Sequence, residues 1–382
     1  MNDLILDLHG LPIGLTMVDP DLRAYVRAHF EASEGPSSQA VVAIHGDWRW
    51  GGAPSNAVAA PRSASTLRAG RGMTLEREGS DGLRCTWTRV PGFPELSLSF
   101  LMSGTGPGRL AVDAHCAYAP RGLARRIRYM NPARVERKRS RLFFKLMYAM
   151  VYSPVAWWLM RTRGWGLLHA SAVALPTGQA VLLAGQGGVG KSTLAMTLLS
   201  MPGARLISDN LLFHDEQMIY ACPEPVRLDG TALAGIAAAG VAPERSSLPR
   251  AAHPKATWRV GQAQRAQSAP PGAMFLLQVG ERPGFEPIAA QQGAEMLRAG
   301  NDLAREIEDH RPVAALLTMM AAQRGGPSAA PAARLENLLA TVRCGVFTIG
   351  ASESIAATAA RLVEEARSGA PVARGTAPGA KV

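Results

Sequence analysis

Cysteine is scarce in this sequence, and the few cysteines lie far apart. The chain of 382 residues holds 4 cysteines, and none of them forms a Cys-x-x-Cys pair. This pattern indicates neither a zinc site nor a disulfide framework. A basic leader region is also missing, because residues 1–10 (MNDLILDLHG) carry acids but no Lys or Arg. We therefore expect no signal peptide and a cytoplasmic location.

Lysine is also rare, so that arginine supplies most of the formal net charge of +11. Basic charge suits acidic partners such as nucleic acid, anionic lipid or an acidic protein. It equally serves solubility alone. Solubility is the simpler interpretation, and we expect no nucleic-acid partner.

One long apolar run stands out against this charged background. Residues 142–160 read LFFKLMYAMVYSPVAWWLM, a length that suits a membrane span. Lys145 and Pro154 interrupt the run, and arginines on both sides make the positive-inside bias uninformative. Two interpretations stay open: a buried or interface helix of a large domain, or a helix that contacts a membrane surface.

Alternation and turn signals divide the chain into four parts. We expect an N-terminal β-rich α+β domain over 1–118, with a helix that begins at Asp19-Pro20 and strands at 40–44, 83–90, 96–102 and 110–114. A basic, then apolar, helical connector follows over 119–165. An α/β domain spans 166–368, and a disordered tail spans 369–382.

The α/β domain is predicted from short apolar strands that alternate with helices. Its expected strands are 169–175, 179–184, 204–207, 274–279 and 346–349, with a hairpin of 211–213 and 218–220. Its expected helices are 192–199, two that begin near Pro312 and Pro331, and one that begins at Ser352. Residues 243–272 are expected to form a mobile polar loop.

A glycine-rich segment between an apolar strand and a helix matches the pattern GxxxxGK[ST]. Glycines let backbone N–H groups turn inward around phosphate oxygens, and the helix that follows adds its N-terminal dipole. The lysine reaches the β- and γ-phosphates, and the serine hydroxyl ligates Mg²⁺. The predicted nucleotide-binding residues are Gly185, Gln186, Gly187, Gly188, Val189, Gly190, Lys191, Ser192 and Thr193.

Two classes of phosphate-loop protein are disfavoured by missing motifs. The sequence holds no guanine-reading Asn-Lys-x-Asp segment and no LSGGQ-like segment, as a GTPase or an ABC-type ATPase would need. Asp209 instead ends a neighbouring apolar strand, a position that faces the phosphate site in doubly wound sheets. There it would hold Mg²⁺ or accept a proton from a hydroxyl nucleophile. The alternative is an Asx-turn residue before the hairpin.

Four segments in this order resemble the kinase domain of HPr kinase/phosphorylase and related peptide kinases. They are Leu168–Val173 with its histidine, the phosphate loop, Leu206–Asn210 with its acid, and Pro-Glu-x-x-Arg at 223–227. The resemblance covers residues 165–230 well and 270–367 in outline. It implies a P-loop kinase domain of the HPr kinase type, a mixed sheet with flanking helices. It also implies ATP and Mg²⁺ as cofactors and a protein or peptide with an acceptor serine as partner.

The same resemblance implies roles for individual residues. Lys191, Asp209 and His169 would be catalytic, and Ser192 with Asp209 would hold the metal. Glu224 and Arg227 match the signature segment near the substrate or phosphate. A structural role for His169 and a surface salt bridge for Arg227 stay open as alternatives. Members of the family are often oligomers, so a homo-oligomer is an expectation without a readable interface.

One residue departs from the family pattern. Asn210 stands where the family has a second acid, and an amide accepts no proton at neutral pH. Two main hypotheses therefore stay open: an ATP-dependent kinase that phosphorylates a hydroxyl, and an ATP-binding regulatory or scaffold protein without phosphotransferase activity. A weaker third, an NTPase tied to membrane transport, rests on residues 142–160 alone.

Overall fold

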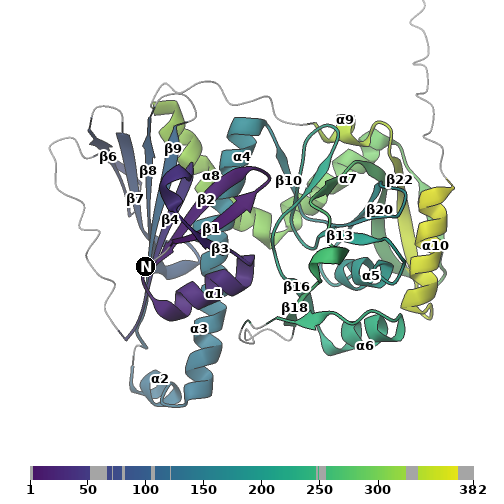
Figure 1. Cartoon of the computed structure of the whole chain (residues 1–382), viewed down its shortest axis with the longest axis horizontal. Helices are drawn as coiled ribbons and strands as arrows, with labels where there is room; N and C mark the ends of the chain where they lie inside the picture. The colour runs from purple at the N-terminus through teal and green to yellow at the C-terminus, as the bar shows by residue number, and fades with distance from the viewer. Residues whose placement is uncertain are drawn as a thin grey trace, which may run out of the picture. The chain divides into compact units, whose positions relative to one another are not determined.

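The protein is described here by a computed structural model (Figure 1). The described residues are 3–51, 67–70, 72–79, 82–104, 108–120, 122–246, 248, 255–323 and 334–368. They divide into two compact units, each built from separate stretches of chain. Unit 1 comprises Met1–Arg163, Ser246–Ala256 and Glu308–Ala330, and unit 2 comprises Gly164–Arg245, Thr257–Ile307 and Pro331–Val382.

Unit 1 is built on a 9-stranded sheet with the order β3-β1-β2-β4-β9-β8-β7-β6-β5. The strands are β1 (Asp3–Leu8), β2 (Leu11–Met17), β3 (Ser33–Gly35), β4 (Val42–Trp50), β5 (Leu67–Gly70), β6 (Met73–Glu78), β7 (Gly82–Val90), β8 (Phe93–Ser103) and β9 (Arg109–Tyr118). The strands expected at 40–44, 83–90, 96–102 and 110–114 are confirmed as β4, β7, β8 and β9, with shifted ends. Strand β4 runs parallel to β2 and β9, and the other pairs are antiparallel.

The helices of unit 1 include the one expected at Asp19-Pro20, which is confirmed as α1 (Pro20–Phe30). The Asp19 carboxylate accepts a hydrogen bond from the Leu22 N–H, 2.8 Å away, and so caps the helix. The other elements are α2 (Leu123–Arg128), α3 (Pro132–Met147), the π-helical turn η3 (Tyr148–Tyr152), α4 (Ser153–Arg163) and most of α8 (Arg305–Gln323).

The apolar run 142–160 lies in the continuous helical stretch from α3 to α4. By length and composition, Pro132–Arg163 is the one stretch of the described chain that passes as a membrane span. A core helix passes the same test, and 83% of its apolar window is buried. Phe143, for example, packs edge-on against Trp48 and Tyr25, with ring centroids 5.1 and 5.3 Å apart. This burial favours the core-helix interpretation, and membrane contact through this run stays a prediction.

Unit 2 is a mixed α/β structure around a 6-stranded sheet with the order β13-β11-β12-β20-β22-β21. Strands β12, β20 and β22 are parallel, whereas β11 runs antiparallel to both of its neighbours, and β21 is antiparallel to β22. Strand β13 is therefore parallel to β12. These strands are β11 (Ser171–Ala174), β12 (Ala180–Ala184), β13 (Arg205–Ser208), β20 (Pro271–Gly280), β21 (Gly284–Pro287) and β22 (Arg343–Gly350).

Helices cover both faces of this sheet, because alternate residues of its strands enter two separate cores. Leu183 and Phe275 pack with the helices α5 (Lys191–Leu198), α6 (Gly230–Ala238) and α10 (Ile355–Arg367). Leu182 and Met274 pack on the other face with α7 (Ala290–Leu303) and α9 (Leu335–Leu339).

Two smaller sheets complete unit 2. A 4-stranded sheet has the order β10-β14-β15-β19, and a 3-stranded sheet has the order β16-β18-β17. Their strands are β10 (Gly166–Leu168), β14 (Leu212–His214), β15 (Ile219–Ala221), β16 (Val226–Leu228), β17 (Glu244–Arg245), β18 (Ala256–Arg259) and β19 (Ser268–Ala269). The hairpin expected around 214–217 is confirmed as β14 and β15.

Three expectations for the predicted α/β domain, 166–368, were wrong in detail. The strand expected at 169–175 is shorter and begins at Ser171 as β11, because the chain leaves the 4-stranded sheet after β10 and enters the 6-stranded sheet only at β11. Of the loop expected over 243–272, residues 247 and 249–254 lie outside the described residues. The rest contains β17, β18 and β19, which form in spite of the polar composition because they pair with other strands. The helix expected to begin near Pro312 begins at Arg305, since apolar residues such as Leu317 bury one side of α8 and offset the proline.

The remaining expectations concern chain ends and helix starts. The last helix begins at Ile355 with Ser354 as its cap, three residues later than expected. The helix start expected near Pro331 and the tail 369–382 lie outside the described residues, and α9 begins at Leu335.

Candidate functional site

The glycine-rich segment forms the turn between β12 and α5, as the pattern predicts. Gly185 has φ of +133°, and a Cβ atom there would lie 2.7 Å from the Leu277 carbonyl oxygen. Gly188 and Gly190 also have positive φ values, +88° and +101°. Only glycine adopts these conformations without strain, so the turn depends on these three residues.

The helix that follows this turn begins without a side-chain cap. Gly190 is the N-cap of α5 and provides no side-chain hydrogen bond. Gln186, Gly187 and Gly188 at the tip of the turn are exposed. Uncapped N–H groups beside an exposed turn suit an anion such as a phosphate group.

Lys191 is the first residue of α5, and its side chain folds back over the turn. Its Nζ donates hydrogen bonds to the carbonyl oxygens of Gly185, 2.7 Å away, and Gln186, 3.1 Å away. The residue is only 8% exposed. Its ammonium group is thus held beside the turn, where it adds a positive charge to the uncapped N–H groups.

The direction of the strands brings Asp209 and His169 to this edge of the sheet. Asp209 follows the end of β13, just as Gly185 follows the end of the parallel strand β12. His169 precedes β11, which runs the opposite way and so begins at the same edge. Lys191 and Asp209 both lie close enough to His169 to affect its pKa. The structure therefore gathers the three residues predicted to be catalytic.

Asp209 is buried, with 4% exposure, and bonded across the sheet. One carboxylate oxygen, Oδ1, accepts a hydrogen bond of 2.6 Å from the Ser171 hydroxyl on β11. Ser171 is itself fully buried. The carboxylate is thus held by the next strand rather than by the local Asx-turn bond that was the alternative. Ser171 carried no signal in the sequence, because a single serine in an apolar strand matches no motif.

Asn210 and the segment 223–227 form a polar chain beside Asp209. The Asn210 amide donates a hydrogen bond of 2.8 Å to Oε2 of Glu224, whose side chain is fully buried. Arg227 lies 3.7 Å from Glu224 and 3.3 Å from Glu306. Arg227 thus bridges two carboxylates, one of them fully buried. The alternative of a simple surface salt bridge does not describe this arrangement.

Glu306 was not foreseen, since it lies far along the chain at the start of α8. Burial alone would raise the pKa of its carboxyl group. The backbone N–H of Glu306, the charge and hydrogen bond of Arg227, and the positive charge that His169 carries when it is protonated outweigh burial and hold that pKa below its ordinary value. Glu306 is therefore an ionised partner of Arg227 at neutral pH.

His169 is positioned by Asn301, near the end of α7. Asn301 accepts a hydrogen bond of 2.9 Å from the His169 backbone N–H and donates one of 3.1 Å to the Leu167 carbonyl. These two bonds hold the chain where it changes sheets. Asn301 was not foreseen either, because an asparagine near a helix end usually serves as a cap.

The pKa of the His169 ring is lowered, first by burial and then by the positive charge of Lys191. Glu306, Asn210 and Asp209 act in the opposite direction and do not restore the ordinary value. The ring is therefore neutral at neutral pH, with one nitrogen as donor and the other as acceptor.

A metal ion at this edge would need ligands beyond the protein. Among the described residues, no group of three or more His, Cys, Asp and Glu side chains gathers in a way that would hold one. Ser192 and Asp209 offer a hydroxyl and a carboxylate, which are oxygen ligands that Mg²⁺ accepts together with phosphate oxygens. The residues present thus fit a magnesium ion that arrives with a nucleotide.

Comparisons with known proteins give little beyond this geometry. No family model and no curated protein sequence matches the chain. Among solved structures, it is similar to one described as "Structure of the Hpr(Ser) kinase/phosphatase from Coxiella burnetii". That match has a TM-score of 0.22 and 14% identity, and covers 32% of this chain and 77% of the other. A likeness at this level carries no argument about function, so any functional proposal depends on the chain's own site.

Proposed function

We propose that this protein is an ATP-dependent kinase that transfers the γ-phosphate of ATP to a hydroxyl group, that of a serine in a protein or peptide. The observation that carries the proposal is the shared sheet edge. Two features lie at this edge: a phosphate-binding turn with an inward-folded lysine, and a buried carboxylate. Such a pairing supplies both parts that phosphoryl transfer needs, a phosphate cradle and a group to orient the nucleophile.

The turn and α5 would bind the phosphates. Backbone N–H groups of the turn and of the first turn of α5 would donate to phosphate oxygens, and Lys191 would exchange its carbonyl partners for them. Ser192 and Asp209 would hold Mg²⁺, which supplies further positive charge when bound. Together these groups would offset the negative charge that develops on the phosphoryl oxygens.

Asp209 would orient the acceptor hydroxyl and accept its proton as the new oxygen–phosphorus bond forms, while the bond from the γ-phosphorus to the bridging oxygen breaks and ADP leaves. Because Ser171 holds Oδ1, the direction of the carboxylate is set before substrate arrives. Neutral His169 would donate a hydrogen bond from its ring N–H to a phosphate oxygen without adding charge. Arg227 is bridged to Glu224 and Glu306, so we assign it to positioning in the free protein.

A second candidate function is ATP binding without transfer, in a regulatory or scaffold protein. The observation that favours it is the bond from the Asn210 amide to buried Glu224. At the position where the resembling family has a second acid, this chain has an amide that already donates a hydrogen bond to Glu224. If that position must accept the proton, the protein would bind ATP and phosphorylate nothing.

The test is phosphate transfer from γ-labelled ATP with Mg²⁺ to serine-containing peptides, including those encoded by neighbouring genes. We expect acid-stable phosphoserine with the wild-type chain. Asp209→Asn should lose at least about a hundredfold in rate while it still binds ATP. Asp229→Asn is the matched control, because Asp229 only caps α6 and asparagine caps equally well.

The results separate the two candidates. Binding of ATP without labelling of any peptide, by a wild-type chain that is folded, would favour the regulatory protein. Equal transfer rates for Asp209→Asn and the wild type would remove Asp209 from the mechanism.

A further inference from the structure

Unit 1 carries a basic stripe along one side of α3. Arg134, Arg137, Lys138 and Arg141 are spaced so that they share a helix face. The three arginines are exposed, and Lys138 is half-buried. The opposite side of the helix is apolar and buried, with Leu142, Phe143, Leu146 and Met147. Helix α3 is therefore anchored by one face and presents cations on the other.

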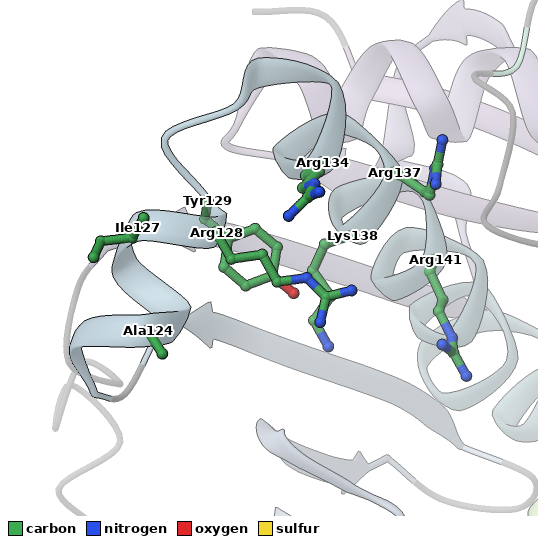
Figure 2. A pocket seen from close by; sticks show the side chains of 8 residues that line it. All are labelled: Ala124, Ile127, Arg128, Tyr129, Arg134, Arg137, Lys138 and Arg141. Atoms are coloured by element: carbon green, nitrogen blue, oxygen red, sulfur yellow. The ribbon is translucent and has the colours of Figure 1, made fainter.

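These cations line a surface pocket of about 620 Å³ together with residues of α2. Figure 2 shows Arg134, Arg137 and Arg141 extending from α3, while Arg128 reaches from α2 toward Lys138. Among the residues that the structure describes, no acidic side chain lines the pocket. Glu95 offsets part of the charge of Lys138, because its carboxylate is 4.0 Å from the Lys138 ammonium.

The guanidinium groups of Arg128, Arg134, Arg137 and Arg141 form no hydrogen bond or ion pair with any residue that the structure describes. Like charges at these helical spacings repel each other, and this repulsion destabilises the surface when nothing compensates it. A ligand with several negative charges would remove the repulsion. The stripe is thus suited to an anionic partner.

Apolar side chains stand exposed next to this stripe. Leu123, Ile127 and Met130 are 75%, 59% and 79% exposed, at spacings that place them along one side of α2 and the turn after it. They are three of the eight large apolar side chains that are exposed in the described chain. An apolar edge beside arginines is the pattern of a helix that lies in a membrane interface.

We propose that α2 and the basic face of α3 form a docking surface for an anionic lipid bilayer. Arg128, Arg134, Arg137 and Arg141 would contact lipid phosphates, while Leu123, Ile127 and Met130 would enter the boundary between headgroups and acyl chains. A nucleic acid or an acidic peptide would use the cations alone and would leave the apolar residues in water. The exposed apolar edge therefore favours the bilayer.

The test is flotation of the full-length protein with vesicles of phosphatidylcholine alone and with about 30% phosphatidylserine added. We expect binding to the anionic vesicles only, weakened by salt at about 0.5 M. The triple variant Arg134→Gln/Arg137→Gln/Arg141→Gln should bind at least about tenfold less, and Leu123→Ser/Ile127→Ser/Met130→Ser should bind similarly less.

One control variant removes the same number of positive charges elsewhere, and a second removes other exposed apolar side chains. Arg77→Gln/Arg109→Gln/Arg282→Gln changes three other arginines that are exposed, and Val18→Ser/Val279→Ser changes other exposed apolar residues. Both control variants should float like the wild type. Circular dichroism checks the fold of every variant, and all the changed residues are exposed, so that unfolding is not expected.

Two results would overturn the proposal. One is failure of the folded wild-type chain to bind anionic vesicles. The other is loss of binding in the arginine variant while the Leu123, Ile127 and Met130 variant binds normally and duplex DNA or poly-glutamate competes fully with the vesicles. That outcome would assign the stripe to a polyanion. Neither result bears on the kinase proposal, because that proposal depends on residues of unit 2.

Discussion

The Ser171 hydroxyl donates a hydrogen bond of 2.6 Å to the Asp209 carboxylate, and both side chains are buried at the edge of the 6-stranded sheet. The bond joins β11 to the residue after β13, so that strand β11 fixes the position of the carboxylate. A buried carboxylate needs such a partner, because an unpaired one is costly to bury. Ser171 is therefore the residue that positions the proposed base.

Replacement of this hydroxyl tests the positioning role directly. We expect Ser171→Ala to lower kcat by about ten- to a hundredfold, while KM for ATP changes by less than about threefold, since the phosphate turn is untouched. Steady-state kinetics at saturating peptide measures both constants. Ser99→Ala also removes a buried serine hydroxyl, but in unit 1, and should leave kcat unchanged. An unchanged kcat in Ser171→Ala would contradict a positioning role for Ser171.

An acid at position 210, as in the kinases that the sequence resembles, should destabilise this chain. Asn210→Asp would place a carboxylate where the amide now donates to the buried carboxylate of Glu224, 2.8 Å away. Two like charges at this distance repel, so we expect the free energy of unfolding to fall by roughly 2–4 kcal/mol at neutral pH. Denaturant unfolding of the variant measures the loss.

A second substitution tests whether that loss comes from the pair itself. In Asn210→Asp/Glu224→Gln the glutamine amide would donate to the new carboxylate, so the bond returns with its direction reversed. We expect at least half of the lost stability to return, which a double-mutant cycle reports as a coupling of about 1 kcal/mol or more. Strictly additive changes would show that the two side chains do not interact.

The turn offers a matched pair of glycines for a test of its conformation. Gly185 has φ of +133° and a Cβ there would meet the Leu277 carbonyl oxygen at 2.7 Å, whereas a Cβ at Gly187 meets nothing within 4 Å. Gly185→Ala should therefore lower stability by roughly 1–3 kcal/mol, and Gly187→Ala by less than about 0.5 kcal/mol. Thermal unfolding compares them, and equal losses would contradict the described turn.

Acid should weaken unit 1 through His310. This residue is 6% exposed, and within the described chain neither ring nitrogen has a hydrogen bond of normal geometry. Burial lowers the pKa of the ring from 6.5 to about 4, although the nearby Ser153 backbone favours the protonated form. Between these values the unfolded chain binds more protons than the folded chain. Stability is therefore fully present above pH 6.5 and is lost as the pH falls toward 4.

The size of this effect follows from the shift in pKa. We expect the wild type to lose roughly 2–3 kcal/mol more than His310→Leu between pH 7 and pH 4, measured by denaturant unfolding at each pH. His45→Leu, at a partly exposed histidine, serves as the control for the loss of a histidine side chain as such. Parallel curves for the wild type and His310→Leu would contradict a buried neutral ring.

The sequence predicts best where a backbone conformation demands particular residues. Positive φ at Gly185, Gly188 and Gly190 needs glycine, and the Asp19-Pro20 pair suits a helix start. The glycine-rich turn at 185–190 and α1 were therefore predictable. Asp209 was found because it ends an apolar strand beside the turn, a relation that the topology of α/β sheets makes general.

The sequence predicts poorly where distant segments meet. Ser171, Asn301 and Glu306 join the site through pairing and packing that no local pattern records. The chain passes from the 4-stranded to the 6-stranded sheet at His169, and this passage likewise depends on which strands pair with β10 and β11. The apolar run 142–160 has a membrane-like composition because it is buried, and composition alone does not distinguish a protein core from lipid.

Equilibrium binding of Mg·ATP to the wild-type chain and to Lys191→Ala tests the central claim most directly. We expect saturable binding by the wild type and by the control Lys255→Ala. Lys191→Ala should bind Mg·ATP about a hundredfold more weakly, which is a loss of about 2.7 kcal/mol in binding free energy. Its Tm should change little, because the Lys191 ammonium of the wild type bonds to the turn carbonyls of Gly185 and Gln186. Equal affinities for Lys191→Ala and the wild type, or no binding of ATP by the folded wild type, would contradict the account.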